Sequence, residues 1–149
     1  MRTATVRIPW NHPPVTQIQL LRPEGLVASP AFSHVAVVPP GATTIYVGGQ
    51  NAVDHDGTLV GGSDVAAQTT KVMDNLVTAL AAAGAGVQDL VSVTVVLVDG
   101  VDVPSAYAAA APSLAAATTP PLVSAMLVSA LGVPGALVEV SAVAALATP

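Results

Sequence analysis

A long uncharged segment constrains this chain more than any other feature. Residues 103–138 contain no Asp, Glu, Lys or Arg. A membrane-spanning helix requires about 20 consecutive apolar residues, and no basic cluster follows that would orient one. Prolines and glycines also divide the segment, at Pro104, Pro112, Pro120, Pro121, Gly132, Pro134 and Gly135. The segment therefore predicts a soluble protein with an unusually apolar surface, and such surfaces usually mark interfaces between subunits.

Charge is scarce in the rest of the chain as well. The 149 residues include four Lys or Arg and nine Asp or Glu, for a formal net charge of −5, and no basic residue follows Lys71. Neutralising phosphate groups requires clustered basic side chains. We therefore expect no nucleic-acid partner, no RNA-cleaving role and no membrane partner.

The absence of cysteine and the composition of the N-terminal residues exclude further classes of protein. Without cysteine there is no disulfide framework, no thiolate metal site and no cysteine nucleophile. Residues 1–14 lack the apolar run of a signal peptide, which favours a cytoplasmic location. Prolines within residues 1–15 predict an irregular arm that carries Trp10, and residues 16–149 have the length of a single domain.

Two helices are indicated by capping residues and by apolar residues at helical spacing. Ser63 can cap the first helix, with an aspartate in its first turn, and Gly84 is expected to end it. Asp102, followed closely by a proline, predicts the start of a second, alanine-rich helix that runs to about Ala111.

Alternating or β-branched runs predict six strands. These runs are Val15–Leu21, His34–Val38, Thr44–Gly48, Val91–Val98, Leu122–Ala130 and Ala136–Ala145. A Pro-Pro-Gly turn at residues 39–41 predicts that the second and third strands form an antiparallel hairpin. The order of elements contains two β-α-β crossovers, which place both helices on one face of a mixed sheet. We expect a partner subunit to cover the other face, because the chain offers no third layer.

Glu139 is the most informative polar residue. It is one of two glutamates and the only charged residue after Asp102, and it lies within an apolar strand. A buried carboxylate without a partner is costly and has a raised pKa, and in a cleft it could bind or activate water. Strand alternation could equally point Glu139 outward to solvent, so both interpretations stay open.

Other polar clusters carry weaker signals. Gly48-Gly49-Gln50 ends a strand and could let a ligand approach the backbone, although a simple bulge explains it equally well. Asp54-His55-Asp56 directly before Gly57 has ordinary turn composition, and its spacing matches no metal-binding motif. The nucleophile elbow of serine hydrolases and a phosphate-binding loop are both missing. We therefore expect no metal and no cofactor.

Four segments together resemble the Rid family, also called YjgF, reactive-intermediate deaminase or endoribonuclease L-PSP-like. They are residues 22–35, 44–53, 56–99 and 135–145, within a resemblance that covers about residues 20–146. Within the first predicted helix, Asp64, Gln68, Asn75 and Leu76 match the family pattern. The resemblance implies an α+β, chorismate-mutase-like fold of the bacillus type with the order β-β-β-α-β-α-β-β. It also implies a homotrimer with small-molecule clefts between subunits.

For the archetypal branch, the resemblance implies hydrolysis of reactive enamines and imines to a 2-oxo acid and ammonia. There a glutamate positions water, a strand-end glycine contributes backbone, and an arginine binds the substrate carboxylate. The glutamate corresponds to Glu139, the glycine to Gly49 beside Gln50, and the arginine to Val123 in Pro121-Leu122-Val123-Ser124. Valine offers no charge-assisted hydrogen bond.

The rest of the cleft is also expected to be apolar. The resemblance aligns a cleft tyrosine with Phe32 and a helical asparagine with a position near Tyr107, and Met126 or Leu127 could complete the wall. No basic residue lies near Val123 in the sequence, although Arg22 or an N-terminal arginine of a neighbouring subunit could approach it.

Two functions from different classes follow from these observations. The first is a hydrolase-type enzyme for an imine, enamine or related apolar metabolite, in which Glu139 activates water. It differs from the archetypal 2-imino acid deaminase because Val123 replaces the arginine. The second is a non-catalytic trimer that binds a small molecule or serves a regulatory role.

Overall fold

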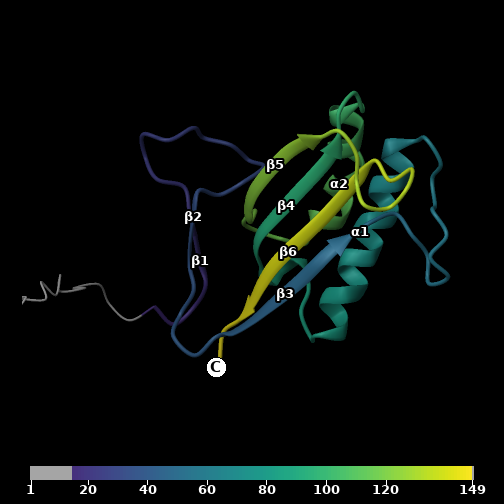
Figure 1. Ribbon diagram of the computed structural model, residues 1–149. Coiled ribbons are helices and arrows are strands. Elements are labelled where there is room, and N and C mark those ends of the chain that lie inside the picture. The colour runs from purple at the N-terminus through teal and green to yellow at the C-terminus, as the bar shows by residue number, and fades with distance from the viewer. Residues whose placement is uncertain (1–14, 149) are drawn as a thin grey trace, which may run out of the picture.

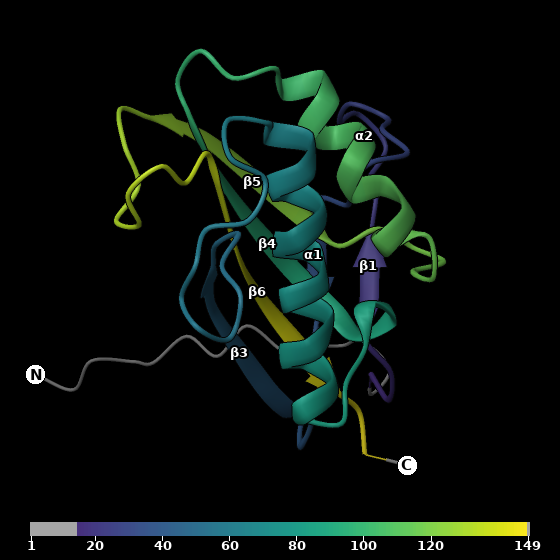
Figure 2. The ribbon, with the colours of Figure 1, turned by 90° about the vertical axis from the view of Figure 1, so that its right-hand side faces the viewer.

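A four-stranded mixed sheet with two helices on one face forms the body of the protein (Figures 1 and 2). The computed structural model describes residues 15–148. Across the sheet the strand order is β3-β6-β4-β5, in which β4 and β5 run parallel and the other neighbours antiparallel. The strands are β3 (Thr43–Gln50), β4 (Leu90–Val98), β5 (Leu122–Val128) and β6 (Val138–Leu146). The predicted arm with Trp10 lies outside the described residues, apart from residue 15.

The N-terminal strands differ from the sequence-based prediction. β1 (Gln19–Leu21) pairs with β2 (Val35–Val37) in a separate two-stranded sheet, at the left of Figure 1. The predicted hairpin between residues 34–38 and 44–48 is therefore wrong, because β3 pairs with β6 instead. The two prolines at 39 and 40 carry no backbone N–H and cannot continue a ladder, whereas β6 offers a long partner strand.

The first helix, α1 (Val65–Ala82), begins one residue later than expected. Asp64, rather than Ser63, is the N-cap, and its carboxylate accepts hydrogen bonds from two backbone N–H groups of the first turn. Gly84 follows the helix with a φ of +74°, a left-handed conformation that glycine adopts without strain. A short 3₁₀ helix, η1 (Val87–Asp89), then leads into β4.

The second helix, α2 (Val103–Leu114), is capped by Asp102 as predicted and extends three residues beyond the expected end. It continues through Pro112, which lies in the last turn. The two crossovers, β3-α1-β4 and β4-α2-β5, place both helices in front of the sheet in Figure 2, which confirms the predicted layering.

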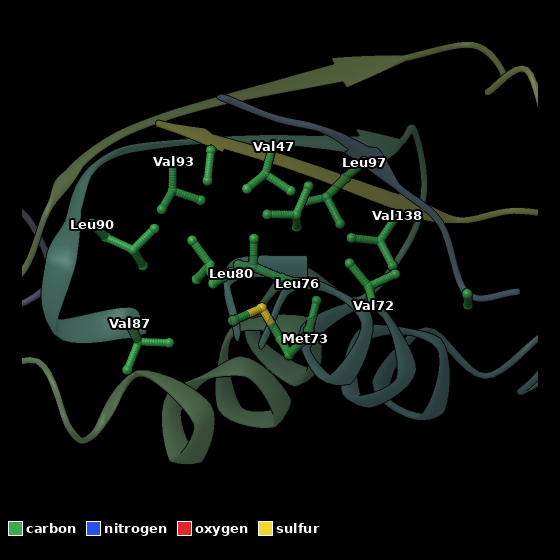
Figure 3. Close-up of a cluster of buried hydrophobic side chains, with 14 of the residues drawn as sticks. Val47, Val72, Met73, Leu76, Leu80, Val87, Leu90, Val93, Leu97 and Val138 are labelled. Carbon is green, nitrogen blue, oxygen red and sulfur yellow. The ribbon is translucent and has the colours of Figure 1, made fainter. Parts of the chain in front are cut away.

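The hydrophobic core fills the space between α1 and the sheet (Figure 3). α1 contributes large side chains with almost no exposure, and valines and leucines of the strands pack against them. Burial of each such side chain contributes about 2 kcal/mol relative to leaving it in water. The principal members are Val72, Met73, Leu76 and Leu80 from α1, and Val47, Val93, Leu97 and Val138 from the strands.

Residues 15–148 leave the face of the sheet away from the helices partly exposed. It carries exposed apolar side chains, including Tyr46 at 80% exposure and Met126 at 48%. Between residues 15 and 148, no helix combines the length and hydropathy needed to span a bilayer.

Candidate functional site

A cavity of about 610 Å³ lies between α2 and strands β4 and β5. It exists because both of its walls carry small side chains: Ala106 and Ala110 on α2, and Ala125 on β5. Alanine ends at Cβ, so these positions cannot fill the space as the leucines of α1 do. The volume lies within the range of natural small-molecule sites.

The floor of the cavity is the hydrophobic core itself. Met73 of α1, Leu97 of β4 and Val138 of β6 all line it, and each is at most 4% exposed. These side chains offer no charge and no hydrogen-bonding group other than a weak thioether. The buried Thr69 also lines the cavity, but its hydroxyl donates to the Val65 carbonyl, so the deep part of the site favours an apolar group.

Three residues predicted for the cleft line the wall and rim of this cavity. Phe32 comes from the loop after β1, Tyr107 from α2 and Val123 from the start of β5. Tyr107 is 61% exposed, which places it at the open side. The ring of Phe32 packs edge-on against His34, with centroids 5.4 Å apart.

Ser33 explains how the loop reaches β5. Its backbone N–H donates to the Pro121 carbonyl at 3.0 Å, and its hydroxyl donates to the Pro120 carbonyl at 2.7 Å. Ser33 also forms an isolated parallel bridge with Leu122. This buried serine therefore holds Phe32 beside the start of β5, and sequence reasoning did not identify it.

Arg22 lines the same cavity, directly after β1. The residue before it, Leu21, accepts a hydrogen bond from the backbone N–H of His34 at 2.9 Å. Because His34 follows the bridged Ser33, the pairing of β1 with β2 brings Arg22 to the cavity that Val123 lines. The sequence raised this approach only as one of two alternatives.

Glu139 lies on the other face of the sheet, beside Gly49. The pairing register of β3 with β6 shifts between Val47 and Gln50, so Gly48 and Gly49 form a bulge. A Cβ atom added to Gly49 would lie 2.5 Å from Oε1 of Glu139, so the carboxylate occupies the space that any side chain would need. Glycine is therefore required here for close approach, not for backbone conformation.

Strand register places two more candidates on the face of Glu139. Val96 of β4 pairs with both Glu139 and Met126, so these three form one row across the sheet. The adjacent row contains Ser124, Thr94 and Ser141. Paired residues share a face because side chains alternate along each strand. Gln50 ends β3, where its amide donates to the Gly48 carbonyl at 3.2 Å.

The predicted site residues thus form two groups. Phe32, Tyr107 and Val123 line the cavity on the helix side. Glu139 and Gly49, with Ser124 and Met126, lie on the opposite face. A shift of one residue reverses the face of every side chain in a strand, and only the pairing register settles which residue belongs to which group.

Several acidic residues outside this region serve turns and helix caps. The hydroxyl and the backbone N–H of Ser105 hold the pKa of the Asp102 carboxyl below its usual value. The backbone N–H of Thr58 acts in the same way, lowering the pKa of Asp54 in its turn. Within the described part of the chain, no three His, Asp or Glu side chains cluster closely enough to hold a metal ion.

Comparison with known proteins identifies relatives in one family. The family model described as endoribonuclease L-PSP matches residues 24–146. The chain is 32% identical to the Rid-family protein YyfB from Yersinia pestis, with a TM-score of 0.77, covering 87% of this chain and 99% of YyfB. It is 26% identical to RidA from an Antarctic Psychrobacter, with a TM-score of 0.62, covering 78% of this chain and 94% of RidA. A comparison with curated proteins found no match.

The matched region includes both helices and all four strands of the main sheet, so the relationship extends over the whole folded body. It confirms the resemblance and the α+β, chorismate-mutase-like fold expected from the sequence. The chain therefore belongs to the Rid family, whose model carries the name endoribonuclease L-PSP.

Proposed function

We propose that this protein is a homotrimeric hydrolase for an imine, an enamine or a related metabolite with an apolar body. Residues 16–149 would form the single domain of each subunit. Glu139 would be the catalytic residue, and the cavity lined by Phe32, Tyr107 and Val123 would receive the substrate. The proposal excludes small 2-imino acids bound in the archetypal manner, because Val123 stands at the arginine position.

The contact between Glu139 and Gly49 supports the catalytic assignment most directly. The carboxylate lies against a glycine that leaves space for it, in a row of apolar side chains and with partial exposure. Within residues 15–148, no side-chain hydrogen bond or ion pair occupies it. A structural carboxylate would normally bond to neighbouring donors, so this one remains available to a water molecule.

The chemistry needs only one proton-accepting group. The Glu139 carboxylate accepts a proton from water as the water oxygen forms a bond to the imine carbon. The carboxyl then returns this proton to the nitrogen, which gives a carbinolamine. Its hydroxyl proton passes through the same carboxylate to the amino group as the carbon–oxygen double bond forms and the carbon–nitrogen bond breaks, so that ammonia and a carbonyl compound leave. A bulge leaves its extra residue unpaired, so the backbone N–H of Gly49 is suited to orient the polarised nitrogen or oxygen.

The separation of the two groups supports an oligomer. Glu139 and the cavity lie on opposite faces of the sheet, so one chain cannot apply both to the same small molecule. A second copy that packs its Glu139 face against the cavity rim of the first would complete the site. Such packing would also cover the exposed Tyr46 and Met126 side chains.

The altered cleft supports a second candidate function, the binding of a small molecule without turnover. Val123 and Phe32 replace two polar residues of the family pattern, and the cavity floor is mostly apolar. These features favour binding of a small molecule without turnover as the alternative. Activity of a Glu139 variant separates the two functions.

The test uses an imine and an enamine generated in the assay. A flavin amine oxidase produces an apolar imine from 2-phenylethylamine, and a pyridoxal-phosphate lyase produces the enamine 2-aminoacrylate from serine. We expect the protein to accelerate ammonia release from the imine and to leave that from the enamine near its spontaneous rate. Glu139→Gln should remove the acceleration, whereas Glu24→Gln, at the only other glutamate, should not.

Each outcome decides one part of the proposal. Robust turnover of 2-aminoacrylate would contradict the role assigned to Val123. Acceleration that survives in Glu139→Gln would remove the catalytic assignment. No acceleration of either reaction by a protein that still binds small molecules would favour the non-catalytic alternative. A monomer in sedimentation analysis would contradict the shared site.

A further inference from the structure

Among residues 15–148, Arg22 is the one charged residue that lines the cavity under α2. No aspartate or glutamate borders this cavity, and the described residues include no ion-pair partner for Arg22. The side chain is exposed, so its guanidinium is hydrated and available. In a chain with four basic residues in all, an arginine with no ion-pair partner among residues 15–148 thus borders an apolar cavity.

The position of Arg22 is fixed by a series of contacts. Leu21, the last residue of β1, pairs with Val35 of β2 and accepts the N–H of His34. Ser33 then joins β5 through the Pro120 and Pro121 carbonyls. These contacts hold the backbone next to Arg22 at the edge of the cavity.

The chemistry of the lining selects one class of ligand. The planar guanidinium matches a carboxylate through two parallel charge-assisted hydrogen bonds. Most of the remaining lining, including Ala110, Ala125 and Val123, is apolar and favours a hydrocarbon chain or ring. A polar or dianionic ligand would leave hydrogen-bonding groups unpaired against this wall.

We propose that the cavity binds monocarboxylates with an apolar chain or ring, with Arg22 as the partner of the carboxylate. The apolar body lies between the alanine face of α2 and strands β4 and β5, and the carboxylate stays at the rim. Arg22 thus supplies, from the N-terminal sheet, a cation that Val123 cannot provide from β5. The inference rests on the proposed function only in taking this cavity as the binding site of the family fold.

The direct test is calorimetric titration of the full-length protein with octanoate, octanamide and butyrate. Octanamide has the same chain without the charge, and butyrate has the charge with four fewer methylene groups. We expect octanoate to bind about tenfold more tightly than octanamide. Butyrate should bind roughly a hundredfold more weakly than octanoate, because each buried methylene contributes about fourfold to affinity.

Matched variants assign the two parts of the site. Arg22→Gln should bring octanoate to the affinity of octanamide, whereas Lys71→Gln removes an equal charge outside the cavity and should leave both affinities unchanged. Ala110→Leu fills the cavity and should weaken both eight-carbon ligands by at least tenfold. Ala125→Leu approaches the same space from β5, so the result does not depend on one variant being folded.

Several outcomes would overturn the inference. Equal affinity for octanoate and octanamide in the unchanged protein, or equal effects of Arg22→Gln and Lys71→Gln, would remove Arg22 as the anchor. No binding of octanoate, or binding unaffected by both leucine variants in folded protein, would remove the cavity. The titration measures binding alone and imine turnover measures Glu139, so this inference and the proposed function can fail separately.

Discussion

The two helices cover the same face of the sheet but pack against it in different ways. α1 presents Val72, Met73, Leu76 and Leu80, all nearly inaccessible to solvent, whereas the only buried residue of α2 is Ala106. The first pairing produces a dense core and the second leaves a cavity of about 610 Å³. The β3-α1-β4 crossover is therefore densely packed, whereas the β4-α2-β5 crossover leaves open space.

The part of the sheet under α1 and the part under α2 are therefore expected to serve different purposes, stability and ligand binding. Dense packing maximises dispersion contacts and leaves no room for a ligand. A wall of alanines gives up part of that stabilisation and creates a volume that a ligand can occupy. Substitutions in α1 should therefore act on the free energy of unfolding, and substitutions near α2 or β3 should act on function.

The largest expected effect tests the packing difference directly. Leu76→Ala should lower the free energy of unfolding by about 3 kcal/mol, because Leu76 is fully buried and the dense core cannot collapse around the gap. Leu114→Ala, at a half-buried residue that already borders the cavity, should cost less, about 1 kcal/mol. Urea denaturation measures both, and equal losses would contradict the division between the two helices.

The next effect concerns the polar anchor of α1. The Gln68 amide donates to the carbonyls of Gly62 and Gly135 and accepts the N–H of Leu137, just before β6. Gln68→Ala leaves these groups without partners in a buried region, at a cost of about 2 kcal/mol. Gln88→Ala removes an exposed amide whose one side-chain hydrogen bond among the described residues is to the adjacent Asp89, and it should change stability little. Comparable losses for the two variants in urea denaturation would argue against the anchor.

A functional effect is expected on the opposite face of the sheet. Gly49→Ala would force the Glu139 carboxylate to move, and the proposed hydrolysis should lose roughly tenfold to a hundredfold in kcat/KM. Gly48→Ala is the control, because no atom lies within 4 Å of its added Cβ. Imine turnover by the two variants makes the comparison, and equal activity would show that the position of Glu139 is not critical.

The smallest effect is a pH dependence at the start of α2. The Ser105 hydroxyl and N–H favour the charged form of Asp102, so its pKa in the folded protein lies below the unfolded value. This contribution to stability is complete above the unfolded pKa, near 3.8, and is lost as pH falls through the folded pKa. Asp102→Asn should flatten that part of the profile in thermal unfolding between pH 5 and pH 2. An unchanged profile would assign the acid sensitivity to other carboxyl groups.

Local chemistry made much of the fold predictable. The N-cap near Ser63, the glycine at position 84 and the aspartate at position 102 gave both helices to within a few residues, because caps act within one turn. Pairing was harder to predict. The expected hairpin fails because β3 finds its partner in β6, about a hundred residues later, and no local signal encodes that choice.

The same distinction between local chemistry and long-range pairing applies to the candidate site. Residue types singled out Glu139 in its apolar strand and the small residues at Gly48 and Gly49, since a lone carboxylate and paired glycines are unusual there. Their contact depends on the bulge in β3, and the separation of Val123 from Glu139 depends on strand register. Arg22 entered only as an alternative, because its approach to the cavity is made by Ser33 and β5.

The sequence by itself determined the order of elements, the family and the apolar character of the long uncharged segment, because these follow from residue type and short-range spacing. Only the tertiary structure decided which face each strand residue occupies, where the alanines of α2 leave space and which cation borders it. Those properties arise from long-range pairing and from the volume left between packed side chains, and neither quantity is carried by any single segment of the chain.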